Sequence, residues 1–207
     1  MNIQEAYNIW ATQYDTNKNK TRDLDQKVTK QILSNYTFSN VIELGCGTGK
    51  NTDFLLTKAQ SITGIDFSEE MLNKAKAKFK HKHVIFQQSD LTANWNLPNA
   101  STDLVTCNLV LEHIENLSIV FRQAHEKLTR NGIFFISELH PFKQYTGSKA
   151  RFETDNGTQE LETYVHHISD FLNVAQEIGF KMIELNEWFD ELEPNEIPRL
   201  VSFVFCK

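Results

Sequence analysis

The chain contains few residues of the kinds that interrupt or cross-link a fold. Of its 207 residues, 8 are glycine, 4 are proline and 3 are cysteine. Cys46, Cys107 and Cys206 are odd in number and widely spaced, which argues against a disulfide framework and against a zinc motif. Reduced thiols indicate a cytoplasmic protein, and no apolar run reaches the length of a membrane span.

Positive charge is also scarce. Lys and Arg number 21 against 27 Asp and Glu, so the formal net charge is −6. An acidic chain without long basic runs is a poor partner for nucleic acid or for an anionic membrane surface. Hydrophobic residues make up 40% of the chain, which is enough for one sizeable core. We therefore expect a single domain over residues 1–207.

Short apolar runs alternate with helix-like segments along most of the chain. The expected strands are residues 40–44, 61–65, 83–88, 103–108 and 133–138, and the expected helices are residues 28–33, 51–59, 69–80 and 117–128. Residues 15–25 have the composition of a mobile loop. The alternation predicts an α/β fold with a parallel sheet, right-handed crossovers and helices on both faces.

The last part of the chain departs from this alternation. We expect a helix over residues 164–178 that ends at Gly179, a residue type favoured just beyond a helix. Two apolar runs follow, residues 180–188 and 200–206, separated by a turn that contains Pro194 and Pro198. Because no helix separates these runs, they are predicted to form an antiparallel pair at the sheet edge.

Three of the eight glycines, Gly45, Gly47 and Gly49, lie directly after the first expected strand. Ligands of open parallel sheets bind beyond the carboxyl ends of the strands, and glycines there allow close approach of the backbone. Asp66 ends the second strand, where it can accept hydrogen bonds from two ribose hydroxyls. Asp90, one strand further on, can accept from an exocyclic amine such as that of adenine. The pattern therefore predicts an elongated ligand that contains adenosine.

The spacing of the glycines decides between ligand classes. A dinucleotide fingerprint is Gly-x-Gly-x-x-Gly, whereas this loop has Gly-x-Gly-x-Gly. A phosphate-binding Gly-Lys-Ser/Thr loop is excluded because Lys50 is followed by Asn51. A nicotinamide-dependent oxidoreductase on a related sheet stays open as an alternative.

Five ordered motifs carry a family resemblance over roughly half of the chain. They are Val-Ile-Glu-Leu-Gly-Cys-Gly-Thr-Gly (41–49), Gly-Ile-Asp-Phe-Ser-Glu-Glu-Met-Leu (64–72), Gln-Ser-Asp-Leu (88–91), Asp-Leu-Val-Thr-Cys-Asn (103–108) and Leu-Glu-His-Ile (111–114). With them, the sequence resembles the class I S-adenosylmethionine-dependent methyltransferases. The resemblance implies a Rossmann-like, doubly wound, mostly parallel seven-stranded sheet whose last strand is antiparallel. It also implies the cofactor S-adenosyl-L-methionine and the product S-adenosyl-L-homocysteine.

The resemblance assigns cofactor-binding roles to residues on these motifs and to one N-terminal tyrosine. They are Tyr14, Glu43, Gly45, Cys46, Gly47, Asp66, Phe67, Met71, Asp90, Leu91 and Asn108. Gly45 and Gly47 would approach the methionine and ribose portion, Phe67 and Met71 would flank the adenine, and Asn108 would lie near the sulfonium. Two simpler interpretations stay open: Asp66 as a helix-capping carboxylate and Met71 as a core residue.

Two histidines are candidates for the catalytic base. Methyl transfer is an in-line displacement, which depends on positioning, and a hydroxyl acceptor benefits from a base. His140 follows the fifth expected strand near the rim where acceptors enter, and His113 lies in Leu-Glu-His-Ile. The alternatives are a loop histidine bonded to the backbone for His140 and a structural role at a helix start for His113.

The acceptor side is expected in two segments, residues 1–36 as an N-terminal lid and residues 141–163 as an insertion. The core that binds the cofactor would be residues 37–140, and residues 164–207 would form the C-terminal helix and β-hairpin. Candidate acceptor residues are Trp10, Tyr145, Arg151 and His166. The row Tyr7, Trp10 and Tyr14 also fits an amphipathic helix packed on the core. Two interpretations of Arg151 stay open: it binds a carboxylate of the acceptor, or it is a surface residue.

The leading hypothesis is a metal-independent methyltransferase for a small molecule, with an oxygen acceptor preferred. The fourth strand ends in Asn-Leu-Val-Leu, which lacks the Pro-Pro pair of enzymes that methylate amino groups of bases, and no carboxylate replaces Asn108 to suggest a magnesium site. Alternatives are N- or C-methylation of a small metabolite, the oxidoreductase, and a non-catalytic binding subunit. No nucleic-acid or membrane partner is expected, and the protein would be a monomer or a homodimer.

Overall fold

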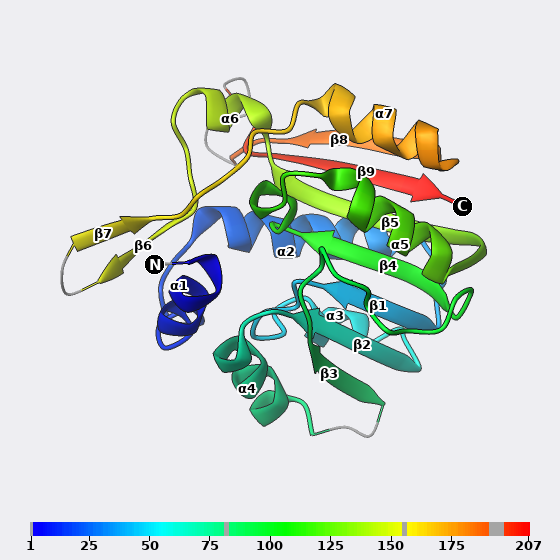
Figure 1. Ribbon diagram of the computed structural model, residues 1–207, viewed down its shortest axis with the longest axis horizontal. Coiled ribbons are helices and arrows are strands. Elements are labelled where there is room, and N and C mark those ends of the chain that lie inside the picture. The colour runs from blue at the N-terminus through cyan, green and yellow to red at the C-terminus, as the bar shows by residue number, and fades with distance from the viewer. Residues whose placement is uncertain (1, 81–82, 155–156, 191–196) are drawn as a thin grey trace.

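The computed structural model describes residues 2–80, 83–154, 157–190 and 197–207. It contains a seven-stranded sheet in the order β3-β2-β1-β4-β5-β9-β8 (Figure 1). The strands are β1 (Asn40–Leu44), β2 (Ser61–Asp66), β3 (Val84–Gln88), β4 (Thr102–Asn108), β5 (Leu128–Leu139), β8 (Lys181–Trp188) and β9 (Leu200–Cys206). A separate two-stranded sheet pairs β6 (Arg151–Thr154) with β7 (Gly157–Glu160).

Strand directions in the large sheet agree with the predicted fold class. Strands β1 to β5 pair in parallel, whereas β9 pairs antiparallel with both β5 and β8. The last strand is therefore the reversed one, as predicted, and β8 runs in the same direction as the first five strands. The predicted antiparallel pair at the edge is confirmed, with β8 outermost and β9 inserted between β8 and β5.

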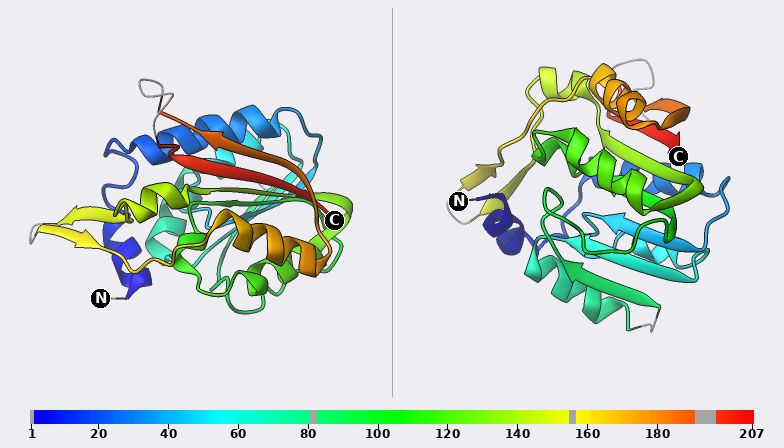
Figure 2. Two further views of the ribbon diagram at one scale, coloured as in Figure 1. Left: turned by 90° about the horizontal axis from the view of Figure 1, so that it is seen from above. Right: turned by 45° about the vertical axis from the view of Figure 1, so that its right-hand side comes forward.

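Helices cover both faces of the sheet, and each face has its own hydrophobic core. Neighbouring residues of a strand point to opposite faces. Val41 accordingly packs in the core under α2 (Lys20–Leu33) and α3 (Thr52–Leu55), and Ile42 in the core under α5 (Leu117–Lys127) and α7 (Ile168–Ile178). Figure 2 shows α2 on one side of the sheet and α5 and α7 on the other. Burial on both faces explains why the strands are continuous apolar runs.

Helix α2 differs from the sequence prediction because it begins at Lys20 rather than at residue 28. The loop expected over residues 15–25 is thus wrong for its second half. Asn19 caps the helix by accepting a hydrogen bond of 3.0 Å from the Arg22 amide. The first turns bury Arg22 and Asp25 in polar contacts, so they lack the apolar spacing by which an amphipathic helix is found.

Helix α7 begins at Ile168, so the expected helical start at residue 164 is wrong. The Tyr164 amide donates to the Glu112 carbonyl at 2.7 Å, which holds this segment away from a helical path. Gly179 ends the helix with a left-handed φ of 101°, as predicted. The Pro194 part of the predicted turn lies outside the described residues.

Helix α4 (Glu69–Lys78) lies beside β2 and β3, and Ser68 caps it as expected by accepting from the Met71 amide at 3.2 Å. The other expected elements agree to within a few residues, except that α3 is shorter and β5 begins directly after α5.

Three elements lie beyond the carboxyl ends of the central strands: α1 (Ile3–Trp10), α6 (Pro141–Tyr145) and the β6–β7 hairpin (Figure 1). Ala6 and Trp10 of α1 pack with Met71 of α4 and with Leu161, which follows β7. This third core holds α1 between α4 and the segment after the β6–β7 hairpin.

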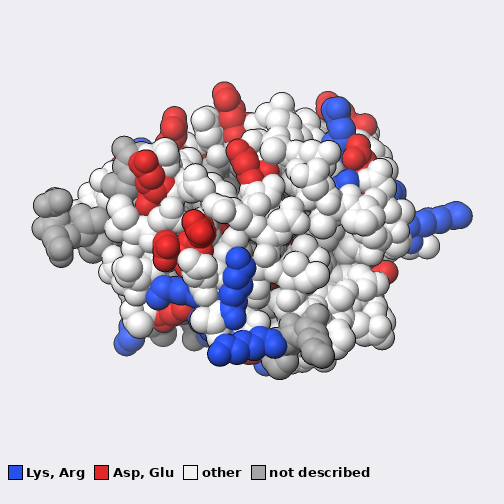
Figure 3. All heavy atoms as spheres, turned by 60° about the horizontal axis from the view of Figure 1, so that its bottom comes forward, with Lys and Arg blue, Asp and Glu red and all other residues white. Residues whose placement is uncertain are grey.

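The surface around α4 and β3 carries scattered acidic and basic side chains with uncharged areas between them (Figure 3). None of the helices in the described part of the chain combines the length and the apolar character needed to cross a membrane.

Candidate active site

The loop after β1 holds its glycines in left-handed backbone conformations. Gly45 has a φ of 62° and Gly47 a φ of 52°, a region that residues with a Cβ atom rarely adopt. A Cβ on Gly45 would lie 2.1 Å from Cγ2 of Val110, whereas a Cβ on Gly47 would meet no atom within 4 Å. Gly45 therefore allows two segments to pack closely, and Gly47 leaves open space in front of the loop.

Asp66 lies at the end of β2, beside this loop. One carboxylate oxygen accepts from the Gly47 amide and the other from the Ser68 amide, each at 2.8 Å. The side chain is 7% exposed, and burial raises the pKa of the carboxyl to about 6. Since each carboxylate oxygen can accept a second hydrogen bond, Asp66 retains acceptor capacity for a ligand.

A cavity of about 250 Å³ opens in front of Gly47 and Asp66. Of the residues predicted to bind the cofactor, those that line it are Tyr14, Gly45, Gly47, Asp66, Phe67, Met71, Asp90, Leu91 and Asn108. They come from α4, from the ends of β1, β2, β3 and β4, and from the segment after α1. This agrees with the expectation that ligands bind where the strand order reverses, between β1 and β4.

The two remaining predicted cofactor residues lie behind the glycine loop. Glu43 is buried, accepts a hydrogen bond from the Thr52 hydroxyl and lacks contact with the cavity in front of Asp66. Burial raises the pKa of its carboxyl to about 8. Cys46 is buried beside Gly64, and its amide donates to the Ile65 carbonyl at 3.0 Å. Both residues therefore support the loop from within the fold.

Asn108 is oriented by α2, which the sequence interpretation does not connect with the site. Its amide nitrogen donates to Asp25 and to the Thr29 hydroxyl, both at 2.8 Å. Asp25 also accepts from the Asn51 side chain at 3.0 Å. Burial raises the pKa of the Asp25 carboxyl. In the sequence, the contact between Asn108 and α2 is indicated only by Asp25, an acidic residue that precedes the apolar spacing of residues 28–33.

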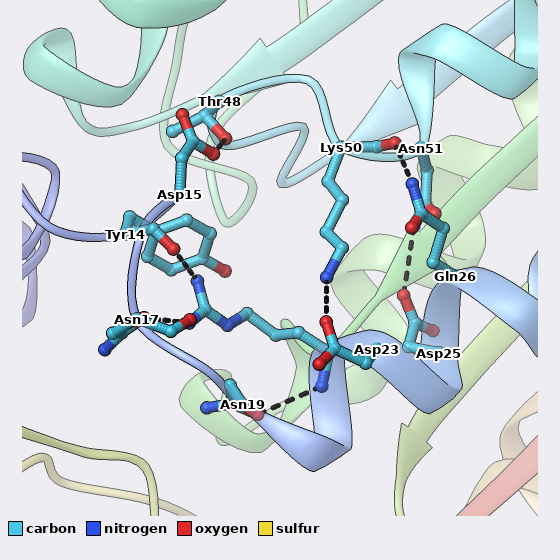
Figure 4. A network of polar contacts seen from close by, with 11 residues as sticks. Tyr14, Asp15, Asn17, Asn19, Asp23, Asp25, Gln26, Thr48, Lys50 and Asn51 are labelled. Carbon is cyan, nitrogen blue, oxygen red and sulfur yellow. Dashed lines mark hydrogen bonds and ion pairs between the residues drawn. The ribbon is translucent and has the colours of Figure 1, made fainter.

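The segment between α1 and α2, together with the start of α2, makes polar contacts with the glycine loop and with Lys50 after it (Figure 4). Asp15 accepts from the Thr48 hydroxyl at 2.6 Å, and Lys50 pairs with Asp23 at 2.6 Å. The Arg22 guanidinium donates to the Tyr14 carbonyl and lies 3.9 Å from the centre of the Tyr14 ring. These contacts position Tyr14 at the cavity.

His113, in the short 3₁₀ helix η1 (Leu111–His113), lines the same cavity. Its Nδ1 lies 3.1 Å from the Glu162 carbonyl, which requires a proton on Nδ1. Its Nε2 is then an acceptor, and the Tyr7 hydroxyl lies 2.9 Å from it. Burial lowers the pKa of His113, so the ring is neutral at neutral pH. Burial raises the pKa of Tyr7 well above its usual value, so its hydroxyl keeps the proton.

His140 is placed differently from His113. It is 2% exposed and does not line the cavity. Its Nδ1 accepts from the Phe142 amide at 3.1 Å as the cap of α6, and its Nε2 lies 2.8 Å from a Glu187 oxygen on β8. This position matches the alternative of a histidine bonded to the backbone.

A second cavity, of about 600 Å³, adjoins the first, and both are lined by Tyr7, Tyr14 and Leu109. Of the four predicted acceptor residues, Trp10 and Arg151 line this second cavity. Tyr145 and His166 do not: Tyr145 is exposed and hydrogen-bonded to His167, and His166 contacts the Ile114 carbonyl at 2.8 Å. Within the described residues, no group of three His, Cys, Asp or Glu side chains is arranged to hold a metal ion.

Comparison with known proteins finds a family whose model matches part of this chain. Residues 42–136 match the family model described as a methyltransferase domain. A malonyl-[acyl-carrier protein] O-methyltransferase of Bacillus anthracis is 29% identical over 193 residues, covering 89% of this chain and 65% of that protein. The chain spans less than two thirds of the length of several curated relatives that it matches.

Solved structures share the fold at low sequence identity. An S-adenosylmethionine-dependent methyltransferase from Mesorhizobium loti matches with a TM-score of 0.73 and 20% identity, over 87% of this chain and 96% of that one. The N-methyltransferase NodS from Bradyrhizobium japonicum, in complex with S-adenosyl-L-homocysteine, matches with a TM-score of 0.74 and 14% identity, over 100% and 99%.

The cavity in front of Gly47 and Asp66 fits S-adenosylmethionine. Gly47 leaves the space in front of the loop open, and Asp66 presents a buried carboxylate with free acceptor capacity beside it. Asp90, at the other end of the cavity, uses one oxygen for Thr92 and keeps a second oxygen for a ligand. These features, with the family match, identify residues 42–136 as a methyltransferase domain whose cavity fits S-adenosylmethionine.

Proposed function

We propose that the protein transfers a methyl group from S-adenosylmethionine to a small-molecule acceptor, with an oxygen atom as the preferred acceptor and without a metal ion. The observation that carries this proposal is the pair of adjoining cavities that share Tyr7, Tyr14 and Leu109. One cavity has the groups that an adenosine-containing cofactor needs. The other, lined by Tyr7 and Trp10 of α1, gives a second molecule a place beside it, and its volume of about 600 Å³ suits a small ligand.

Different residues of the first cavity are proposed to bind different parts of the cofactor. Asp66 would accept from the ribose hydroxyls, while Phe67 and Met71 would enclose the adenine and Asp90 would accept from its amine. Gly45 and Asn108 lie at the methionine portion. The bound cofactor supplies a methyl group on a sulfonium, a strong electrophile. Holding the acceptor oxygen in line with that methyl group accounts for much of the expected acceleration.

The pair Tyr7 and His113 is the proposed route for the acceptor's proton. Tyr7 lines both cavities, and its hydroxyl lies 2.9 Å from Nε2 of the neutral His113. Bound S-adenosylmethionine would supply the methyl group of the new carbon–oxygen bond and would leave as neutral S-adenosylhomocysteine. The acceptor hydroxyl gives its proton to the Tyr7 oxygen, and Tyr7 gives its own to His113. His113 is preferred over His140 because His140 lies outside both cavities.

The proposal is tested with S-adenosylmethionine whose methyl group carries an isotope label. The protein is incubated with a cell extract divided into a small-molecule fraction and a macromolecular fraction, and the label is followed by mass spectrometry. We expect label in the small-molecule fraction, bound to oxygen. Transfer to protein or nucleic acid would contradict a small-molecule acceptor. Cofactor binding without transfer in either fraction would support a non-catalytic binding subunit instead.

A further inference from the structure

The second cavity is strongly basic although the chain as a whole is acidic. Six cationic side chains line it: Lys18, Lys20, Arg22, Lys149, Arg151 and Arg199. We call this space the basic cavity. Three separate parts of the chain contribute the cations, namely residues 18–22 around the start of α2, residues 149–151 up to the first residue of β6, and Arg199 just before β9. In a chain of net charge −6, such a gathering of positive charge is an unusual local feature.

Among the described residues, little negative charge offsets these cations. The one described lining residue with a carboxyl group is Glu112, which is buried, and burial raises its pKa to about 7. Arg199 is neutralised by Asp190, which holds it through two oxygens, and Lys149 lies 3.8 Å from Glu160. The other cations that line the basic cavity outnumber the described acidic residues that line it.

Two of the cations are available to a ligand: Lys18 and Arg151 are exposed, and within the described ranges neither forms an ion pair. Lys20 is exposed too, but its charge adds to that of Arg199 in lowering the pKa of Asp190. Helix α2 begins at Lys20, so the positive end of its dipole adds to the same field. A group that carries negative charge would form charge-assisted hydrogen bonds here, which are about twice as strong as neutral ones.

The basic cavity also has an apolar side, and that side leads to the cofactor. Trp10, Leu109, Leu139 and Ala150 lie among its lining residues, and Leu109 belongs to the cofactor cavity as well. A ligand with an apolar body can therefore extend from the cations toward the shared wall. Its far end would lie beside the hydroxyl of Tyr7.

We infer that the methyl acceptor is an anionic small molecule, anchored by a carboxylate or phosphate group in the basic cavity. This inference rests on the proposed function and names its substrate class. The anion serves as the anchor and not as the methylated atom, because hydrogen bonds from several cations lower its nucleophilicity. A second atom of the same molecule, a hydroxyl oxygen in the proposed reaction, accepts the methyl group at the shared wall.

The test uses calorimetry on protein saturated with S-adenosylhomocysteine. The probes are benzoate, phenyl phosphate and, as the neutral control of the same size, benzamide. We expect benzoate or phenyl phosphate to bind at least about tenfold more tightly than benzamide, and added salt to weaken that preference. The relative affinity of the two anions distinguishes a carboxylate anchor from a phosphate anchor.

Two double variants localise the effect. Lys18→Gln/Arg151→Gln removes two cations of the basic cavity, and Arg130→Gln/Lys181→Gln removes two exposed cations at the starts of β5 and β8. The first should lose about tenfold in affinity for the anionic probe, and the second should match the wild type. Both should bind S-adenosylhomocysteine as the wild type does, which also reports correct folding.

The outcomes separate this inference from the proposed function. If the wild type fails to bind S-adenosylhomocysteine, the proposed function is wrong. If S-adenosylhomocysteine binds but the anions bind no better than benzamide, or both double variants lose equal affinity, the anionic acceptor is wrong and the proposed function stands.

Discussion

Alanine substitutions at three glycines separate the roles that the structure gives to the glycine loop. Gly45, Gly47 and Gly179 all have positive φ values, of 62°, 52° and 101°. Gly179 ends α7, and a Cβ there would meet its nearest atom, on His125, at an ordinary 3.8 Å. Gly179→Ala thus measures the backbone cost alone, which we expect to be about 1–2 kcal/mol in the free energy of unfolding.

The other two variants should depart from this reference in different ways. Gly45→Ala places a Cβ 2.1 Å from Val110, so overpacking adds about 1–3 kcal/mol to the backbone cost. Gly47→Ala adds no clash within the protein and should cost the same as Gly179→Ala. Its Cβ enters the cofactor cavity, however, so its affinity for S-adenosylhomocysteine should fall at least about tenfold, the equivalent of about 1.4 kcal/mol.

Urea denaturation without cofactor measures the first quantity, and calorimetric titration with S-adenosylhomocysteine measures the second. Cofactor must be absent from the denaturation, because a ligand of the folded state raises the apparent stability. The reasoning is refuted if Gly47→Ala binds as tightly as Gly179→Ala, or if Gly45→Ala is no less stable than Gly179→Ala.

Three further predictions concern titration and proton transfer. The pKa of Asp66 is about 6, and ribose hydroxyls donate to its ionised form. Affinity for S-adenosylhomocysteine should therefore be constant near pH 8 and fall about tenfold per pH unit below pH 6. Calorimetric titrations from pH 5 to 8 that show no change in affinity would contradict this. Burial raises the pKa of Glu43 to about 8, so the folded state favours the protonated form and stability should decrease as the pH rises from about 4.5 to 8. Glu43→Gln should make that decrease smaller in urea denaturation, and an unchanged pH dependence would exclude the role of Glu43. Tyr7→Phe keeps the ring but removes the hydroxyl that contacts His113, so turnover of a hydroxyl acceptor should fall at least about a hundredfold while affinity for S-adenosylhomocysteine stays within twofold; normal turnover would exclude the relay.

The sequence is sufficient to predict the fold and the residues that meet at the cavity in front of the glycine loop, because those features are local. The glycine loop, Asp66 and Asp90 each follow a strand directly, and parallel strands bring their carboxyl ends to one edge. The positions of the strands in the sequence therefore predict that Gly47, Asp66 and Asp90 meet, and all three line one cavity. The antiparallel last strand follows from the family resemblance and from the absence of a helix between two apolar runs.

The acceptor side is harder to predict because it depends on residues far apart in the chain. Lys18, Arg151 and Arg199 share no local pattern, and only the packing of α1, α2 and the hairpin against the sheet brings them together. Of these cations, the sequence interpretation singles out Arg151 alone. His140 illustrates the converse: its place after β5 suggests the rim of the site, but its ring contacts Glu187 on β8, which the sequence does not indicate.

The most direct test of the account is a calorimetric titration of S-adenosylhomocysteine into the wild type and into Asp66→Ala, with NADH as a second ligand. We predict one site per chain in the wild type, loss of binding in Asp66→Ala, and no binding of NADH. If the wild type fails to bind S-adenosylhomocysteine at about 1 mM, or binds NADH in its place, the assignment of the cavity to this cofactor is wrong.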